Sequence, residues 1–328
     1  MTGESPELPI NVKKEVLNAE KRIRKYIRET PLEFSPYLSE LGKSNVFLKL
    51  ENIQLTGSFK VRGALNKLLS LSKEEKEAGI ITASSGNHGL AVAYALKVLG
   101  GKGRVILPDY TVKTKVTTLQ YYNIPINFHG SDCEETEAFA RTTALNNNQI
   151  FISPYNDPHI IGGQGTIGIE LMRQLERIDV VFVSVGGGGL ISGIAGYLKS
   201  INKDIKVIGC LPENSPVMYE SIKAGEIISM ESKPTLSDGT AGGIEPNAIT
   251  FDLCKAYVDD FILVTESEIK GALKMILDKH HLIIEGSAGV AVAAYLKIKE
   301  QFEDKNIVLI ICGGNISIDT IKEILCTN

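Results

Sequence analysis

Short apolar runs rich in β-branched residues alternate with helical patterns along almost the whole chain. Runs of this kind, with few polar residues, are typical of strands that are buried on both faces of a sheet. We expect strands at residues 46–50, 80–83, 104–107, 124–128, 180–185, 206–210, 261–264 and 307–312. Because strand and helix alternate, the pattern predicts an α/β fold with parallel strands.

The length of 328 residues exceeds what one compact core usually accommodates, which favours two lobes that share a cleft. The Asn-rich stretch 146–149 and the loop 225–246 are the expected hinge and surface excursions. In parallel sheets, ligands bind at the carboxyl ends of the strands. Unusual residues that directly follow a strand are therefore the candidates for chemistry.

Composition and charge narrow the class of protein. The formal net charge of −4, without a basic cluster, argues against nucleic acid and anionic membranes as partners. The five cysteines are scattered and lack CxxC spacing, which argues against disulfides and structural zinc and fits a cytoplasmic location. There is no signal-peptide pattern at the N-terminus, and no apolar run is long enough to span a membrane.

The segment 51–60 follows the strand 46–50 and precedes the helical pattern 61–71, with Ser58 as the expected N-cap. A lysine in the first turn of a helix lies where the helix dipole disfavours its charge, and partial burial adds to this effect. Lys60 is therefore a candidate amine nucleophile. An ordinary solvated lysine is the alternative interpretation of any lone Lys.

Two further segments begin predicted helices. Residues 84–89, SSGNHG, offer hydroxyls and free amides that could receive a substrate carboxylate, although a polar turn with a Ser cap explains them equally well. The four glycines 186–189 let backbone amides approach a phosphate. They are not a dinucleotide fingerprint, because Ile191 or Ser192 occupies the last glycine position. In a fourth segment, 312–315, a cysteine precedes a tight turn. A buried cysteine that only packs in the core is the alternative interpretation.

Together these segments resemble the serine/threonine dehydratase family of fold-type II pyridoxal 5'-phosphate (PLP) enzymes, which includes serine racemase. The resemblance rests on TGSFKVRGA at 56–64, SSGNHG at 84–89, PYNDP at 154–158 followed by GQGT at 163–166, GGGGL at 186–190 and CGGN at 312–315. It covers nearly the whole chain. It implies two open α/β lobes of the tryptophan synthase β-like type: a large domain of residues 1–78 and 159–328, a small domain of residues 79–158, and PLP in the cleft.

The resemblance also implies roles for individual residues. Lys60 would bind the cofactor as a Schiff base, Asn87 would contact its 3'-oxygen, and Cys312 would lie opposite the pyridine nitrogen. The full set of implied cofactor contacts is Phe59, Lys60, Asn87, Gly186, Gly187, Gly188, Gly189, Leu190, Gly239, Glu285 and Cys312. The implied substrate-binding residues are Ser84, Ser85, Gly86, Asn87 and His88.

The activity implied is that of a PLP-dependent ammonia-lyase, which converts a small 3-hydroxy amino acid such as L-threonine or L-serine to a 2-oxo acid and ammonia. Lys60 would be the general base. Serine racemases also carry a serine at the position of Ser85. An amino-acid racemase is therefore an alternative function. The stretch 237–246 and His280–His281 resemble threonine dehydratase-like and hydroxyectoine-utilisation dehydratases, so a hydroxyectoine-derived substrate is a further alternative. A β-replacement enzyme and a non-catalytic binder of PLP remain rivals.

Other expectations concern metals, partners and regulation. Metal-activated members of the family carry a glutamate before the proline that ends one strand, whereas Leu211 precedes Pro212 here and Val217 follows, so we expect no metal. His280 and His281 have a simpler interpretation as the last turn of a helix. The family suggests a homodimer, and we expect no feedback through a regulatory domain such as biosynthetic threonine dehydratases carry.

Overall fold

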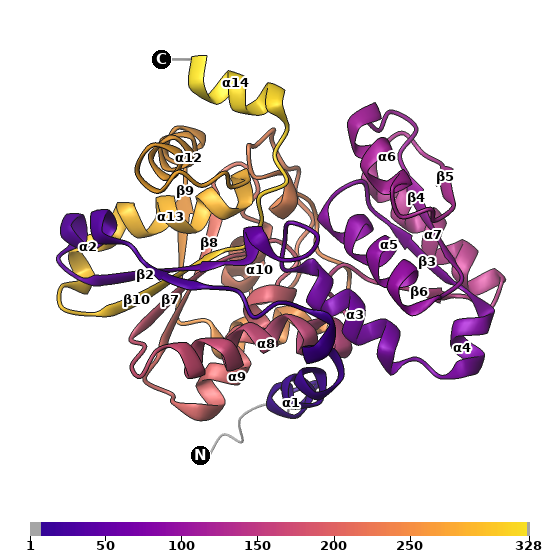
Figure 1. Cartoon of the computed structure of the whole chain (residues 1–328), viewed down its shortest axis with the longest axis horizontal. Helices are drawn as coiled ribbons and strands as arrows, with labels where there is room; N and C mark the ends of the chain where they lie inside the picture. The colour runs from indigo at the N-terminus through magenta and orange to yellow at the C-terminus, as the bar shows by residue number, and fades with distance from the viewer. Residues whose placement is uncertain (1–7, 327–328) are drawn as a thin grey trace.

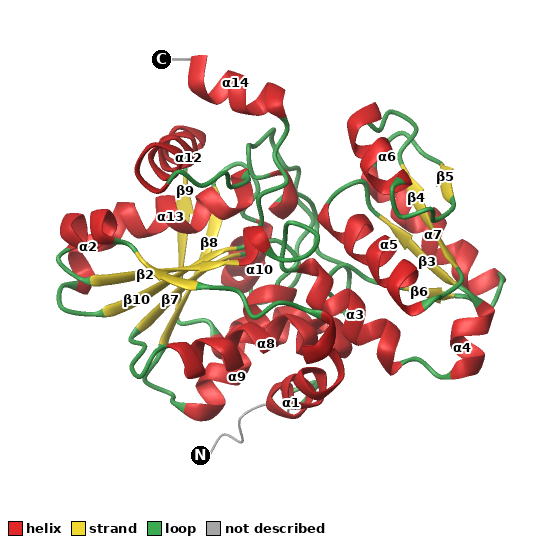
Figure 2. Cartoon of the chain, viewed as in Figure 1, coloured by secondary structure: helices red, strands yellow, loops and turns green. Residues whose placement is uncertain are grey.

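The computed structural model describes residues 8–326, which form two β-sheets flanked by helices (Figures 1 and 2). The larger sheet has the strand order β1-β2-β10-β7-β8-β9, and its strands are β1 (Leu32–Phe34), β2 (Asn45–Leu50), β7 (Val180–Ser184), β8 (Lys206–Pro212), β9 (Asp260–Val264) and β10 (Asn306–Ile311). The smaller sheet has the order β5-β4-β3-β6, with β3 (Ile80–Ala83), β4 (Gly103–Leu107), β5 (Ile126–Phe128) and β6 (Ile150–Phe151). Neighbouring strands pair in parallel, except that β1 is antiparallel to β2. The predicted α/β fold is confirmed.

The predicted strands are all present, with small shifts at their ends. The strand expected from residue 124 begins only at Ile126, after Pro125, which lacks the N–H that a ladder needs. Two strands were not predicted. β1 and β6 have three and two residues, too few to show a period of their own.

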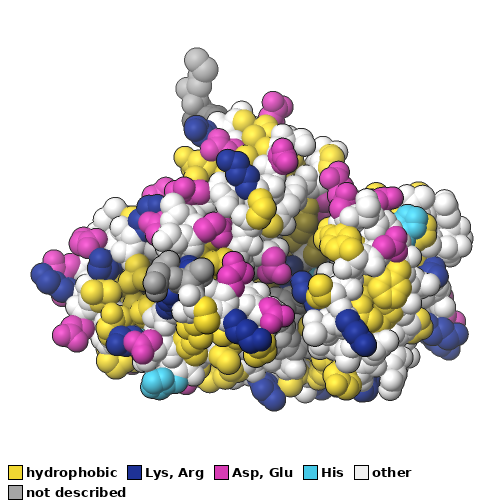
Figure 3. Space-filling model, turned by 90° about the horizontal axis from the view of Figure 1, so that it is seen from above, with side chains coloured by type: hydrophobic (Ala, Val, Ile, Leu, Met, Phe, Trp, Pro, Cys, Tyr) yellow, Lys and Arg dark blue, Asp and Glu magenta, His cyan; other side chains and the backbone are white. Residues whose placement is uncertain are grey.

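We call the smaller sheet and its flanking helices the small lobe, and the rest of residues 8–326 the large lobe. The small lobe has the helices α5 (Asn87–Leu99), α6 (Lys113–Gln120) and α7 (Cys133–Asn146). It lies on the right of Figure 1, and Figure 3 shows a recess where the two lobes meet. The helices outside it are α1 (Val12–Ile23), α2 (Pro36–Gly42), α3 (Lys60–Ser70), α4 (Lys73–Ala78), α8 (Pro158–Gln174), α9 (Gly189–Ile201), α10 (Val217–Ala224), α11 (Ile249–Tyr257), α12 (Glu266–His280), α13 (Gly286–Ile298) and α14 (Ile318–Cys326). Within the described range, the helices are too short or too polar to cross a bilayer.

Local signals set the ends of two important helices. α8 begins where the Asp157 side chain accepts hydrogen bonds from the next amides and Pro158 occupies the first turn. α12 begins with a capping box formed by Thr265 and Glu268. It ends at His281, which has left-handed geometry, so the interpretation of the His pair as a helix end is confirmed.

α3 contacts both lobes, since it packs against α8 of the large lobe and α5 of the small lobe. The approach to α8 is close: a Cβ on Gly163 would lie 2.6 Å from the Cα of Gly63. Glycine at this crossing lets the two backbones touch. The position of α3 is therefore determined from both sides.

A fully buried ion cluster lies beneath α3. The side chains of Lys49, Glu51, Arg62 and Glu170 are 0% exposed and come from β2, the turn after it, α3 and α8. Arg62 donates to Glu51 and to Glu170 at 2.7 Å, and Lys49 donates to Glu170 at 2.6 Å. Two cations thus meet two carboxylates, and the charges of these four groups balance. A buried cluster of this kind is costly to break because each charge depends on the others.

The ion pairs of the cluster also shift the pKa values of Glu170 and Arg62. Burial alone would raise the pKa of Glu170, but Arg62 and Lys49 outweigh burial and lower it to about 2. Burial alone would lower the pKa of Arg62, but Glu51 and Glu170 together raise it. Glu170 and Arg62 are therefore charged at neutral pH.

We predict that Glu170→Gln lowers the free energy of unfolding by about 3–5 kcal/mol, because it leaves Arg62 and Lys49 without a full counter-charge. Folding lowers the pKa of Glu170. In the wild type, the stabilisation that Glu170 contributes to the folded state is therefore present above pH 4.5 and is lost as the pH falls toward 2. Urea unfolding followed by circular dichroism measures both effects.

The matched control is Glu77→Gln, which removes the exposed ion pair between Lys73 and Glu77. Surface substitutions of this kind change stability by about 0.5 kcal/mol or less. If Glu170→Gln cost no more than this control, the cluster would not be a major source of stability.

Candidate functional site

The segments singled out in the sequence meet where the carboxyl ends of the two sheets face each other. β2 and β10 are parallel neighbours, so the turns that follow them lie side by side. The Phe59 amide donates to the Cys312 carbonyl at 3.1 Å, and the Gly314 amide donates to the Gly57 carbonyl at 2.9 Å. The predicted lysine turn and the CGGN turn therefore form one unit.

The start of α3 differs from the expectation. Ser58 does not cap the helix: the N-cap position is Phe59, which already has helical geometry. Ser58 is fully buried in a β-bridge to Gly313. The tertiary pairing with the turn after β10 thus decides the conformation here, and the propensity of serine for helix N-caps does not.

Lys60 is the first residue of α3, and its amine donates to the Pro154 carbonyl at 3.0 Å. The amine lies 5.3 Å from the centre of the Phe59 ring. Burial lowers the pKa of Lys60 to about 8, although nearby Cys312 and Glu285 act in the opposite direction. A substantial fraction of this lysine is therefore the uncharged, nucleophilic amine near neutral pH.

Asn87 and Glu285 join the two lobes at this site. The Asn87 amide donates to both carboxylate oxygens of Glu285 at 2.9 Å, and the Asn315 backbone amide donates to Glu285 at 3.1 Å. The Asn315 side chain in turn donates to the Asn87 carbonyl oxygen at 2.7 Å. Burial raises the pKa of Glu285 to about 7, which makes it a group that titrates in the physiological range.

Cys312 is 2% exposed, and burial, together with the charge of Glu285, raises the pKa of its thiol well above its ordinary value. Its side chain is therefore a neutral thiol at neutral pH. Gly239 lies beside Ser287 and Glu285: a Cβ there would lie 2.6 Å from the Ser287 hydroxyl and 3.7 Å from a Glu285 carboxylate oxygen. The buried hydroxyls of Ser287 and Ser58 have no hydrogen-bond partner among residues 8–326.

The serine loop follows β3 and precedes α5. Ser84, Ser85 and Gly86 are half-buried, and the Ser84 hydroxyl accepts from the Gly86 amide at 3.2 Å, which closes the turn. His88 is different, because its ring is buried and hydrogen-bonds the Ile152 carbonyl at 3.1 Å. Burial lowers the pKa of His88 to about 3, so the ring is neutral and is fixed by the small lobe. The loop can offer a carboxylate the Ser85 hydroxyl and backbone amides.

The glycine loop, residues 186–189, leads directly into α9, and Gly188 has a φ of +85°. A Cβ on Gly187 would lie only 2.4 Å from the Tyr155 ring, so a larger residue would displace this ring. Leu190, which comes next, is buried in the core. Helix N-termini with unobstructed amides bind anions such as phosphate.

Three contributors were missed by sequence reasoning: the Pro154 carbonyl, the Tyr155 ring and the Asn315 side chain. Pro154 and Tyr155 lie in PYNDP, and Asn315 ends CGGN, so the segments were found. Their contacts join residues that are far apart in sequence: 94 positions separate Lys60 from Pro154, and 228 separate Asn87 from Asn315. Local sequence patterns do not report such pairs.

Comparison with known proteins agrees with this geometry. The family described as pyridoxal-phosphate dependent enzyme matches residues 23–313. The chain belongs to this family. An L-threonine ammonia-lyase from Thermotoga maritima is 39% identical over 311 residues, which cover 95% of this chain and 77% of that protein.

Two solved structures also resemble this one. The processed form of threonine deaminase isoform 2 from Solanum lycopersicum has a TM-score of 0.92 at 31% identity, with 99% of this chain and 93% of that chain covered. Maize serine racemase has a TM-score of 0.90 at 31% identity, with 96% of each chain covered. The fold-type II architecture expected from the motifs is thus confirmed.

The residues present fit PLP. A buried lysine with a lowered pKa suits a carbonyl group, and the glycine loop, where a Cβ on Gly187 would meet Tyr155, suits the phosphate. The buried hydroxyls of Ser58 and Ser287 leave hydrogen-bonding capacity at the site. Within residues 8–326, no group of three His, Cys, Asp or Glu side chains is arranged to hold a metal ion.

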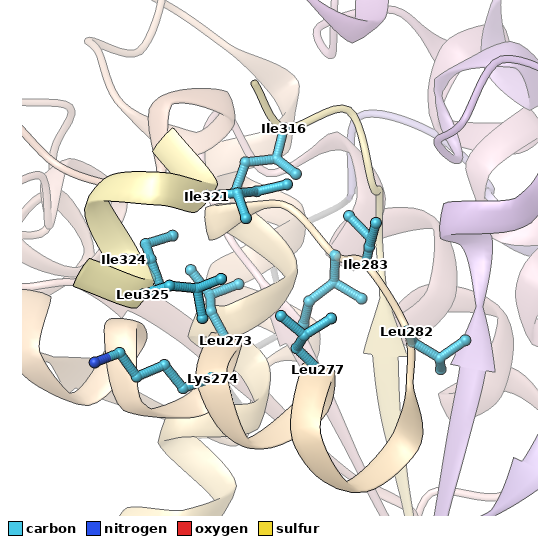
Figure 4. Close-up of a pocket in the computed structure, with 10 residues that line it drawn as sticks. Leu273, Lys274, Leu277, Leu282, Ile283, Ile316, Ile321, Ile324 and Leu325 are labelled. Atoms are coloured by element: carbon cyan, nitrogen blue, oxygen red, sulfur yellow. The ribbon is translucent and has the colours of Figure 1, made fainter. Parts of the chain in front are cut away.

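An apolar cavity lies outside this site, between α12 and α14 (Figure 4). Its walls include Leu277 of α12, Ile324 of α14, and Ile283 and Ile284 from the loop that leads into Glu285. Apart from Lys274 the walls are aliphatic, and they give an amino acid or a phosphate little to bind. The cavity is therefore behind the site and is not part of it.

We predict that amine-selective labelling of Lys60 in the PLP-free protein is half-maximal near pH 8, because burial disfavours the charged form. Below this pH the amine is protonated and the labelling rate falls. Mass spectrometry of labelled peptides measures the rate at each pH. The exposed Lys73 serves as the internal control. Coincident profiles for the two lysines would contradict the burial argument.

Proposed function

We propose that this chain is a PLP-dependent ammonia-lyase that dehydrates a small 3-hydroxy amino acid such as L-threonine or L-serine. The observation that carries the proposal is the half-buried Lys60, with its pKa of about 8, near Glu285, which also accepts a hydrogen bond from Asn87. The 39% identity to an L-threonine ammonia-lyase over 95% of this chain supports the choice of reaction. A hydroxyectoine-derived amino acid is the alternative substrate.

In this proposal the cofactor is held by residues from both lobes. Lys60 supplies the covalent attachment, the glycine loop with Leu190 receives the phosphate, and Asn87 contacts the ring oxygen. The remaining contacts come from Phe59, Gly239, Glu285 and Cys312. Bound PLP supplies an electron sink for the carbanion that forms at the substrate Cα.

The residues of the chain would then orient substrate and move protons. The Ser84–Gly86 turn, with Ser85 and the first amides of α5, binds the substrate carboxylate. The Lys60 amine takes the Cα proton, for which its pKa near 8 is suitable, since a general base works best near the operating pH. The buried Cys312 thiol stays neutral and is at most a weak donor, so it places no charge beside the ring nitrogen. Such a site favours elimination of the hydroxyl over reactions that need a long-lived carbanion.

A racemase activity is the second candidate, and it rests on Ser85. This hydroxyl lies on the half-buried serine loop, and maize serine racemase is among the similar structures. We propose slow racemisation beneath a dominant dehydration, with Ser85 as the proton donor on the face opposite Lys60.

We also propose that residues 79–158 form the small domain, that the protein is cytoplasmic, and that it works without a metal and without nucleic-acid or membrane partners. A homodimer is proposed as well. Partly exposed apolar side chains on β1 and α2 support it: Phe34, Tyr37 and Leu41 are 50%, 38% and 45% exposed.

We predict that the purified protein forms 2-oxo acid and ammonia from threonine or serine, and that Lys60→Ala reduces kcat to background, because both the attachment point and the base are lost. A coupled assay for the 2-oxo acid measures the rate, with 3-hydroxyaspartate and phenylserine as further substrates. Lys73→Ala, which changes an exposed lysine of α4, should leave kcat unchanged. Full activity of Lys60→Ala would exclude the proposed role.

We predict that Ser85→Ala suppresses formation of the D-enantiomer selectively, while dehydration falls by a smaller factor, because Lys60 alone serves the elimination. Chiral chromatography of the remaining substrate measures racemisation. If the wild-type protein forms no D-enantiomer, the racemase candidate is wrong and Ser85 has only the carboxylate role.

A further inference from the structure

The segment that returns from the small lobe to α8 contacts two parts of the site at once. We call residues 152–157 the return segment. Its Pro154 carbonyl accepts the hydrogen bond of the Lys60 amine at 3.0 Å. The next residue, Tyr155, lies against the glycine loop, since a Cβ on Gly187 would lie 2.4 Å from its ring. The conformation of this short segment therefore matters for both the amine and the phosphate end of the site.

No helix or strand includes the return segment, which the structure describes completely, so its shape depends on side-chain contacts. The Ser153 hydroxyl accepts from the Asn156 amide at 3.0 Å within the segment. Two further hydrogen bonds of the segment lead to Glu245 of the large lobe. Ser153 and Asn156 donate to the two carboxylate oxygens of Glu245 at 3.2 and 3.0 Å.

The backbone of Glu245 adds a further link, because its amide donates to the Tyr155 hydroxyl at 2.7 Å. The Asn156 side chain also accepts from the Ile249 amide at 3.0 Å, at the start of α11. Tyr155 is thus held at its hydroxyl end by Glu245, while its ring faces the glycine loop.

The same carboxylate reaches the small lobe. Arg141 of α7 donates to Glu245 at 2.6 Å, and the exposed fractions of these side chains are 36% and 19%. Arg141 is itself held in place by Glu137 at 2.7 Å and by the Phe151 ring, whose centre lies 4.2 Å from the guanidinium carbon. One carboxylate therefore joins the small lobe, the return segment and the loop before α11.

We propose that Glu245 is a positioning residue of the cofactor site: by binding Arg141 and the return segment together, it holds the Pro154 carbonyl at the Lys60 amine and Tyr155 at the glycine loop. The proposal rests on PLP binding through Lys60 and not on the identity of the substrate. A carboxylate that accepts from three side chains on two elements has little freedom to move, and this makes it effective at fixing the segment.

A second ion pair between the lobes offers a matched control. Lys115 of α6 lies 3.5 Å from Asp238, and these side chains are 44% and 71% exposed. This pair also bridges the two lobes but does not touch the return segment. If Glu245 only held the two lobes together, the loss of either ion pair would change PLP binding and Lys60 labelling to a similar extent.

The test uses the full-length protein without substrate. PLP affinity is measured by titrating the PLP-free protein and following tyrosine fluorescence, and the pH profile of Lys60 labelling is measured separately. In Glu245→Gln and in Arg141→Met we expect PLP to bind about tenfold more weakly, the size of one lost coupling between charged neighbours. The labelling midpoint should rise from about 8 toward the ordinary lysine value, because burial is the main cause of the lowered pKa and a loosened return segment admits water.

Three further variants separate positioning from general stability. Arg141→Lys keeps the charge and should recover part of the affinity. The double variant Arg141→Met with Glu245→Gln should be no weaker than the weaker single variant, because both remove the same contact. Lys115→Gln should bind PLP and label like the wild type. Thermal midpoints of all variants show whether each is folded, and if Glu245→Gln does not fold, Arg141→Met carries the test.

PLP affinity within twofold of wild type together with an unchanged labelling profile in Arg141→Met would overturn the proposal, as would equal losses in Arg141→Met and Lys115→Gln. Because neither readout involves turnover, these results are independent of which amino acid the enzyme uses. If instead the wild-type protein and all variants bind PLP normally and none of them forms a 2-oxo acid, both Glu245 as a positioning residue and the proposed ammonia-lyase activity are wrong. If the wild-type protein alone binds PLP tightly but is inactive, only the proposed activity fails.

Discussion

The buried contact between Arg62 and the carboxylates of Glu51 and Glu170 is the interaction on which the site depends most. Arg62 lies two residues after Lys60 in α3, and its partners belong to the turn after β2 and to α8. A guanidinium with two bidentate partners has one orientation relative to them. The direction in which α3 starts, and with it the position of the Lys60 amine, follows from this geometry.

Around this fixed point, the site is assembled from strand ends that belong to different sheets. β2 and β10 bring Lys60 and Cys312 together, β7 supplies the glycine loop, and β3 supplies Asn87 from the other lobe. The hydrogen bonds of Asn87 to Glu285 close this arrangement across the lobes. The chemistry thus depends on the relative position of two sheets as much as on any single motif.

The sequence was sufficient to predict eight of the ten strands of residues 8–326, the fold class and the motif segments, because hydrophobic periodicity and glycine-rich turns are local signals. It was not sufficient where a tertiary contact overrides a local preference. Ser58 has the chemistry of a helix cap, yet the turn after β10 pairs with its backbone. Lys49 is a charged residue within an otherwise apolar strand. Its complete burial is explained only by the ion cluster that contains Arg62 and Glu170. Glu245 is a charged residue in a Gly-rich loop, and nothing near it in sequence points to Arg141, more than a hundred positions earlier.

The position of β10 has a consequence for the order in which the two sheets are completed during synthesis. β10 is the last strand of the chain, but it lies in the interior of the large sheet, between β2 and β7. Before residue 306 leaves the ribosome, β2 has no parallel neighbour, and its apolar edge and the segment that carries Lys60 lack their partners. Pairings so distant in sequence form slowly and leave apolar surface exposed in the meantime. The small lobe, whose strands span residues 80 to 151, has all its strands much earlier. The nascent chain therefore carries a completed small lobe beside an incomplete large sheet until β10 has been synthesised.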